Sequence, residues 1–351
     1  MFIRKSCVLL ALVAAPGLAN GEKDRGSDPE PRRRTRRRVL QVTSAVLASG
    51  GLGAGGYILW GRRQRFGRDA HQTIRDHRVP WPATAPRMVI ARGDDPARNL
   101  RGALERIGGL TQFVTRDDVV LIKPNIGWDR TPEQAANTHP HVVAELIRAC
   151  RECRPRRVIV SDCPVSNSRL AFLRSGIMQV ALAAGAEVLP PEDSRFVTVH
   201  ISDRLGTWDV LEPFVQATKV INVPVAKHHG ETSVTGGMKN WIGITNRLRL
   251  LFHNDIDRSI AELAALMRPT LTILDASRVL MRHGPQGGST ADVKQVNTVA
   301  ACADQVAIDA WACSLLGIPD ARLPGYLHLG QKMGLGRFDF RRLGPTEIQT
   351  G

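Results

Sequence analysis

The sequence predicts an α/β fold in which a mostly parallel sheet is flanked by helices. Apolar runs of strand length alternate with longer amphipathic runs through residues 87–316, which is the pattern of layered α/β domains. Four of the apolar runs end in polar side chains, at Lys123, at Asp162, at Lys227 with His228, and at Asp275. Because parallel strands share one carboxyl edge, where open sheets bind ligands, we expect the functional site at that edge.

Short apolar runs predict the strands, and apolar residues at helical spacing predict the helices. The predicted strands are residues 87–91, 118–125, 157–161, 186–189, 220–225, 271–274 and 297–303. The predicted helices are residues 96–107, 139–151, 170–184, 259–267 and 306–316.

These elements divide the chain into four parts. Residues 1–68 form an export leader or membrane anchor, and residues 69–86, with three prolines, form a linker. A single α/β domain covers residues 87–337, and we expect residues 338–351 to be a loose tail. The terminal region from Gly330 onward is expected to hold one short helix at most.

Composition favours a folded domain and argues against nucleic-acid binding. Hydrophobic residues make up 43% of the chain, and the net charge is +15. Residues 1–68 hold 14 Lys and Arg against 4 Asp and Glu, so the leader carries most of this charge. A nucleic-acid-binding protein needs its basic residues on the folded domain. We therefore expect no nucleic-acid partner.

The cysteines do not form a recognisable metal-binding pattern. Cys150 and Cys153 make a single C-x-x-C among six cysteines. A ferredoxin-type cluster needs four thiolates in a tight run, and zinc needs a second pair of ligands. We expect no iron–sulfur cluster in this chain. A Cys150–Cys153 disulfide stays open as an alternative in an oxidising compartment.

The leader carries an export signature. Residues 35–41, TRRRVLQ, resemble the twin-arginine signal S/T-R-R-x-F-L-K. The uncharged residues 39–60 that follow are long enough to span a bilayer. No clear cleavage site follows, so a removed signal and an uncleaved anchor are both open. We expect the twin-arginine machinery and the membrane as partners, and a location in the periplasm or on the outer face of the cytoplasmic membrane.

A second signal-like segment precedes it. Residues 1–19 have a short basic start and an apolar run, as in a Sec-type signal. Two tandem signals conflict, and an alternative start at Val13 or Leu18 would remove the conflict. The position of the true start is therefore an open question at this stage.

The stretch 219–253 concentrates the chemistry of the chain. Its apolar run, residues 220–225, is followed by Lys227-His228-His229, and a hydroxyl-rich loop then brings Gly236-Gly237 and Lys239. Lysine ammonium groups and glycine-rich backbone bind carboxylate or phosphate. The glycines allow a ligand to approach the backbone. Histidines transfer protons near neutral pH, and a lysine close to other cations becomes a base or a Schiff-base nucleophile.

From these patterns we assign candidate roles. Expected catalytic residues are Lys123, Lys227, His228 and Lys239. Expected substrate-binding residues are Asn125, Thr138, His229, Thr235, Asn240, His253, Gly287 and Gly288. Asp162 and Asp275 are candidate ligands for a divalent metal.

Several motifs together resemble the domain of unknown function 362 family. They are VVLIKPN, T-H-P, VIVSDCP, INVPVAKHH, TGGMKNWIG, LTILDA, HGPQGG and AIDAWACSLLG, in one collinear order over residues 88–337. The family's K-x-H is matched by Lys227-His228-His229, and its M-K-N-x-x-G by residues 238–243. The resemblance implies a shared site without naming a reaction. Many members carry a ferredoxin-like iron–sulfur module, which this chain lacks.

Three functions follow as alternatives. The first is an enzyme that acts on a small carboxylate or phosphate, with or without the help of a metal. The second is a redox protein, as the resemblance implies, although the cluster cysteines are missing. The third is a non-catalytic periplasmic protein that binds a ligand.

Overall fold

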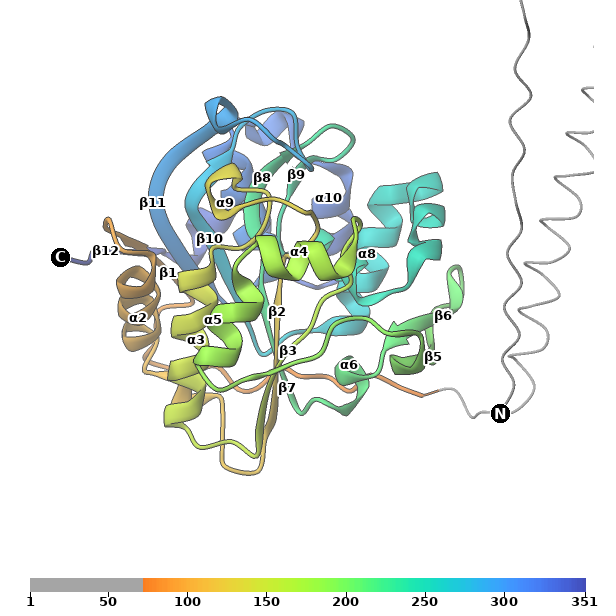
Figure 1. Ribbon diagram of the computed structural model, residues 1–351. Coiled ribbons are helices and arrows are strands. Elements are labelled where there is room, and N and C mark those ends of the chain that lie inside the picture. Colours follow the sequence, from red (N-terminus) through yellow and green to blue (C-terminus); the bar gives the residue numbers. More distant parts are fainter. Residues whose placement is uncertain (1–71) are drawn as a thin grey trace, which may run out of the picture. The chain divides into compact units, whose positions relative to one another are not determined.

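A ten-stranded sheet, mostly parallel, forms the centre of the fold (Figure 1). The computed structural model describes residues 72–351. The strand order is β12-β1-β11-β10-β7-β2-β3-β4, while β8 pairs with β10 and β9 pairs with β8. The strands of this sheet are β1 (Met88–Arg92), β2 (Val119–Pro124), β3 (Arg157–Val160), β4 (Glu187–Val188), β7 (Lys219–Val223), β8 (Val225–His229), β9 (Ser233–Thr235), β10 (Leu271–Leu280), β11 (Val293–Cys302) and β12 (Thr346–Gln349). A separate two-stranded sheet consists of β5 (Phe196–Ser202) and β6 (Gly206–Leu211). The predicted fold class is confirmed.

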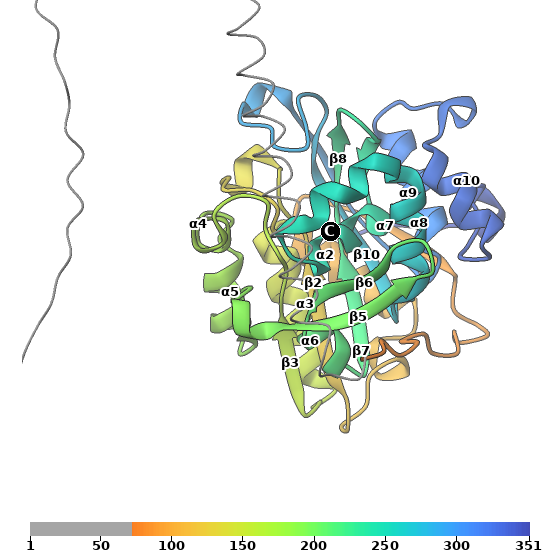
Figure 2. The same cartoon turned by 90° about the vertical axis from the view of Figure 1, so that its right-hand side faces the viewer.

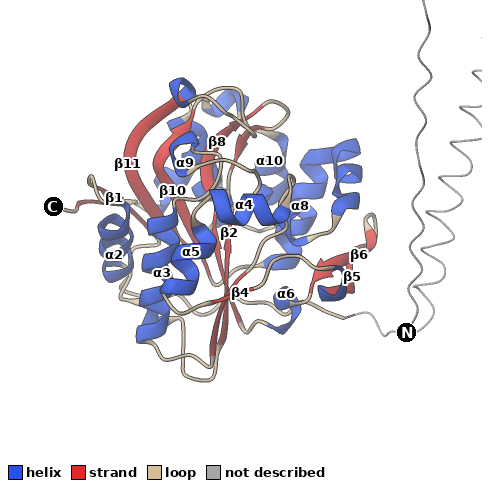
Figure 3. Ribbon diagram, viewed as in Figure 1, coloured by secondary structure: helices blue, strands red, loops and turns tan. Residues whose placement is uncertain are grey.

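Helices cover both faces of this sheet, and Figure 3 shows the strands between the two helical layers. Successive residues of β2 enter opposite cores, because side chains alternate along a strand. Val120 and Ile122 pack on the side of α2 and α3, and Leu121 packs on the side of α8 and α9. The helices are α2 (Pro96–Arg106), α3 (Pro140–Glu152), α4 (Ser168–Arg174), α5 (Ile177–Ala183), α6 (Pro213–Gln216), α7 (Gly237–Asn240), α8 (Ile256–Met267), α9 (Gln305–Leu315) and α10 (Gly325–Lys332).

The single strand predicted over residues 220–225 is interrupted at Pro224. A proline cannot donate a ladder hydrogen bond, and β7 ends at Val223 next to it. The chain then continues as β8, which contains Lys227, His228 and His229. The prediction that these residues follow the strand is therefore wrong. Likewise β10 does not end before Asp275 but continues to Leu280.

The structure also differs from the predicted local structure in two other places. The single helix predicted over 170–184 is divided into α4 and α5 at Gly176, whose φ of 73° lies in the left-handed region. An antiparallel hairpin, β5 with β6, was not predicted, and Figure 2 shows it across the front of the molecule.

The folded body extends beyond both predicted boundaries. The expected tail contributes β12, which pairs in parallel with β1. The expected linker packs against the body, because His77 is buried and its backbone N–H donates to the Arg268 carbonyl at 3.2 Å. Ile74, Val79 and Trp81 also pack against the cores.

The predictions for the leader lie outside the described residues, including the twin-arginine match and the segment 39–60. Within residues 72–351, no helix combines the length and the hydropathy needed to cross a membrane.

Candidate functional site

A fully buried ion pair lies at the carboxyl end of β2. The Lys123 ammonium donates to Asp162 Oδ1 at 2.7 Å, to Asn240 Oδ1 at 3.1 Å and to the Pro124 carbonyl at 3.1 Å. An ammonium group has three protons, so every donor of Lys123 is used. Burial lowers the pKa of Lys123, and the charge of Asp162 opposes that shift. The contacts around Lys123 are thus those of a saturated structural pair.

The glycine of M-K-N-x-x-G is explained by this pair. A Cβ on Gly243 would lie 2.3 Å from Asp162 Oδ1 and 2.9 Å from Lys123 Nζ. The backbone N–H groups of Ile126 and Cys163 donate to the same carboxylate at 2.6 and 2.9 Å. Only glycine leaves room for the pair at this position.

Two asparagines extend the buried network from Lys123 to Lys227. Asn125 Nδ2 donates to Asn240 Oδ1 at 2.9 Å, and Asn125 Oδ1 accepts from Lys227 Nζ at 3.0 Å. Asn240 Nδ2 donates to Asn222 Oδ1 at 2.8 Å. Both amides that were expected to bind substrate are therefore engaged within the protein. They connect Lys227 rigidly to the core.

Strand register decides which predicted residues face one another. In the antiparallel pair β8–β9, Lys227 lies opposite Thr235, and His229 lies opposite Ser233. Because side chains alternate along a strand, Lys227, His229 and Thr235 share one face, which we call the hairpin face. His228 points to the other side, where its Nδ1 accepts the N–H of Gly284 at 3.2 Å. The predicted catalytic residue His228 and the predicted substrate-binding residue His229 therefore lie on opposite faces of β8.

Lys227 and Lys239 bring two buried ammonium groups to this region without a carboxylate partner. Lys227 Nζ donates to Asn125 Oδ1 and to the Ala136 carbonyl, at 3.0 and 2.5 Å. Among the described residues, nothing forms a hydrogen bond or ion pair with Lys239 Nζ. Burial lowers the pKa of Lys227 to about 7, assisted by the charge of Lys239. Burial also lowers the pKa of Lys239 to about 8, although Glu231 opposes this.

A third buried cation, Arg249, borders the same region. Its guanidinium donates to the backbone carbonyls of Cys163 and Pro164. Its charge acts against protonation of both Lys123 and Lys239. The region therefore holds more positive charge than its own carboxylates neutralise.

Asp309 of α9 was missed by the sequence analysis. Its buried carboxylate accepts the backbone N–H groups of Gly237 and Met238, the second at 3.0 Å. A Cβ on Gly236 would lie 2.3 Å from Asp309 Oδ1. The expectation that Gly236-Gly237 admit a ligand is thus corrected, since they admit this carboxylate. Burial raises the pKa of Asp309 to about 7.

The other expected substrate-binding residues lie in varied settings. Thr138 Oγ1 accepts the N–H of Asn125 and donates to the Val223 carbonyl, at 2.8 and 2.7 Å. His253 Nδ1 lies 2.5 Å from Glu231 Oε2 in a half-exposed pair. Gly287 and Gly288 have positive φ, and the Gly288 carbonyl accepts from Gln134 Nε2 at 2.7 Å. Their hydrogen bonds with neighbouring residues give these positions structural roles.

The two candidate metal ligands are both occupied by protein donors. Asp162 holds Lys123 and two backbone N–H groups, as described above. Asp275 accepts the His139 N–H at 2.7 Å and the Ser277 hydroxyl at 2.6 Å. Among residues 72–351, no group of three His, Cys, Asp or Glu side chains is arranged to hold a metal ion. Cys150 and Cys153 are both free thiols.

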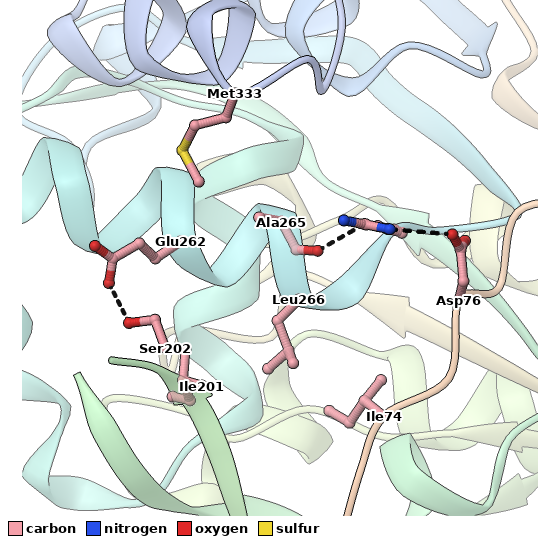
Figure 4. Close-up of a pocket in the computed structure, with 9 residues that line it drawn as sticks. Ile74, Asp76, Ile201, Ser202, Glu262, Ala265, Leu266 and Met333 are labelled. Atoms are coloured by element: carbon pink, nitrogen blue, oxygen red, sulfur yellow. Dashed lines mark hydrogen bonds and ion pairs between the residues drawn. The ribbon is translucent and has the colours of Figure 1, made fainter. Parts of the chain in front are cut away.

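A separate pocket of about 350 Å³ lies between the segment 74–76, β5, α8 and Met333 (Figure 4). Its polar side chains are paired, because Ser202 donates to Glu262 at 2.5 Å and Arg268 donates to Asp76 at 3.4 Å. None of the residues that line it belongs to the cationic region. We therefore place the candidate site at the hairpin face.

Comparison with known proteins places this site in a family. A curated relative, the thylakoid-associated protein sll1697 of Synechocystis sp., is 26% identical over 234 residues, 64% of this chain and 71% of the relative. The solved lactate racemase apoprotein of Thermoanaerobacterium thermosaccharolyticum matches with a TM-score of 0.42 and 13% identity, over 70% of this chain and 59% of that protein's length.

The family model covers the strands and helices that carry the cationic region. It matches residues 120–314, which include Lys123, Asp162, Lys227, Lys239 and Asp309. The chain belongs to the family described as the domain of unknown function DUF362.

Proposed function

We propose that the protein is an enzyme that acts on a small anion, a carboxylate or a phosphate, at the hairpin face. The observation that supports this most is the burial of Lys227 and Lys239 with no acidic partner among the described residues. A buried charge is costly unless it is paired. An anion bound at the Lys239 ammonium would offset that cost and would favour the charged form of Lys239.

Lys227 is suited to act as a general base. A neutral lysine amine has two hydrogens and one lone pair. The two acceptors around Lys227, Asn125 Oδ1 and the Ala136 carbonyl, occupy the two hydrogens. The lone pair is then free to take a proton from a substrate, and a pKa of about 7 makes this base available at neutral pH.

Lys239 is suited to hold the anionic group. Its higher pKa of about 8 keeps it charged over more of the neutral range than Lys227. Its three donors have no partner in the described chain, so all are available to ligand oxygens. The two lysines thus divide the tasks of base and anchor.

Binding of anions tests the first half of the proposal. We expect the full chain to bind acetate, glycolate or inorganic phosphate in a calorimetric titration at constant ionic strength. Lys239→Met should abolish that binding without lowering the free energy of unfolding, because no hydrogen bond or ion pair of the described chain is lost and a buried unpaired charge is removed. The matched control is Lys294→Met, at an exposed lysine. Unchanged affinity in Lys239→Met with a badly destabilised fold would make Lys239 a structural residue.

Turnover separates an enzyme from a binding protein. We expect the full chain to consume at least one anionic compound from a metabolite extract, measured by mass spectrometry. Lys227→Met should bind anions but consume nothing. Enrichment of a compound without consumption by the wild type would favour the non-catalytic alternative.

We also propose that this activity takes place outside the cytoplasm, which rests on residues 35–41. The export receptor reads a pair of guanidinium groups, so replacing Arg36 and Arg37 together with Lys should stop export. Cell fractionation measures the outcome. Continued export of the double variant would show that another signal directs the chain.

A further inference from the structure

The ring of His229 is held in one tautomer. Its Nδ1 accepts the backbone N–H groups of Glu231 and Thr232, at 3.2 and 3.3 Å. A nitrogen that accepts carries a lone pair, so the ring proton lies on Nε2. No described residue forms a hydrogen bond with Nε2. The hairpin between β8 and β9 therefore fixes an N–H donor that the protein does not use.

The surroundings of His229 also keep the ring neutral. The side chain is 8% exposed, and basic side chains act on it from three elements: Lys239 of α7, Lys227 and, from the opposite face, His228 of β8, and His253 of the segment 247–255. Burial, then Lys239 and Lys227, lower the pKa of His229 to about 3. The sequence-based expectation that this histidine transfers protons near neutral pH does not fit these surroundings.

A second neutral donor lies on the same face. Thr235 is buried on the hairpin face opposite Lys227, and its Oγ1 has no hydrogen-bond partner in the described chain. An unsatisfied buried hydroxyl is destabilising, so a ligand oxygen at this place would stabilise it. His229 and Thr235 thus bring two neutral donors to the same face as Lys227, and the charge of Lys239 in α7 acts on both Lys227 and His229.

We propose, building on the anion site described above, that His229 is a specificity-determining residue. Its Nε2–H, with the Thr235 hydroxyl, binds an uncharged oxygen that lies next to the anionic group of the ligand. The preferred ligands are therefore anions that carry a hydroxyl or carbonyl oxygen beside the charged group. A simple anion leaves both donors unsatisfied, which is a strong source of discrimination.

Nitrogen NMR of the full chain tests the tautomer without any ligand. We expect Nδ1 of His229 to be unprotonated and Nε2 to be protonated from pH 5 to pH 9. Assignment comes from the loss of the signals in His229→Gln. A proton on Nδ1, or formation of the imidazolium near pH 6 to 7, overturns the inference.

Matched ligands and matched variants test the specificity. Acetate and glycolate differ only by the hydroxyl beside the carboxylate. We expect the wild type to prefer glycolate by at least about fivefold, the value of one net hydrogen bond. His229→Gln places an amide N–H near the position of Nε2 and should keep the preference. His229→Asn keeps an acceptor near the position of Nδ1 and should lose the preference while still binding acetate.

The outcomes separate the two proposals. Binding of both anions by the wild type without a preference overturns the role of His229 and leaves the anion site intact. A preference that survives in His229→Asn does the same. Failure of the wild type to bind either anion overturns the proposed anion site, and the inference with it.

Discussion

Two groups of buried lysines in this protein differ in how their charge is balanced. Lys123 gives its three protons to Asp162, Asn240 and a backbone carbonyl. Lys227 uses two of its donors, and Lys239 uses none in the described chain. All three are nearly or fully buried. Burial alone therefore does not mark a site, but a buried donor without an acceptor does.

This comparison changes the roles expected from the sequence. Lys123 lies two residues before Asn125, and Lys239 lies directly before Asn240. The sequence predicts a catalytic role for both lysines. The structure connects the two asparagines to each other, so that they support Lys123 on one side and Lys227 on the other. The difference between the paired Lys123 and the unpaired Lys227 and Lys239 can be measured in the stability of variants and in its dependence on pH.

Removing Lys123, the paired lysine, should lower the free energy of unfolding more than the other substitutions. Lys123→Met leaves Asp162 buried without its cation, and breaking such a pair costs about 3–5 kcal/mol. We expect this loss in the free energy of unfolding, measured by urea denaturation, with Lys294→Met as the exposed control. A loss below about 1 kcal/mol would erase the distinction between Lys123 and the unpaired lysines.

A substitution in the pair Gly236-Gly237 should have an intermediate effect on the free energy of unfolding. Gly236→Ala would place a Cβ 2.3 Å from Asp309 Oδ1, and such overpacking costs about 1–3 kcal/mol. The control is Gly230→Ala, whose Cβ would meet its nearest neighbour at 4.0 Å. Equal stability of the two variants, with reduced anion affinity in Gly236→Ala only, would restore the idea that these glycines admit a ligand.

The unpaired lysines should also change how stability depends on pH. Their pKa values of about 7 and 8 lie below the ordinary lysine value of 10.5, so the unfolded chain binds more protons between about pH 7 and 10.5. Stability should therefore rise with pH in this window, by up to about 1.4 kcal/mol per pH unit for each lysine. The double variant Lys227→Met/Lys239→Met should have a flatter profile. Matching profiles would mean that both lysines titrate normally in the folded protein.

Much of the fold could be predicted because its strands are apolar runs that bury both faces. The failures have local causes. Pro224 interrupts a run that otherwise looks continuous, so β8 was mistaken for a loop. The β5–β6 hairpin has only a short signal in the sequence, since Val199 and Ile201 alternate with the exposed His200.

The site was predicted less completely, because its organisation depends on long-range contacts. Alternation along β8 separates His228 from Lys227 and His229, which becomes evident once the strand is extended to His229. The role of Asp309 has no local signal, because its partners at Gly237 and Met238 lie 72 and 71 residues away. Likewise, only the folded structure shows that Asp162 neutralises Lys123 and not Lys227.

The most direct measurement is the titration of the lysine side chains by NMR of protein labelled at the lysine ε carbon. Signals are assigned with Lys123→Met, Lys227→Met and Lys239→Met. We predict that Lys227 and Lys239 titrate near pH 7 and pH 8 in the free protein. The pKa of Lys239 should rise when glycolate or phosphate is added, because an anion bound at its ammonium favours the charged form. Titration of both near the ordinary lysine value, unaffected by either anion, would contradict an anion site at Lys227 and Lys239.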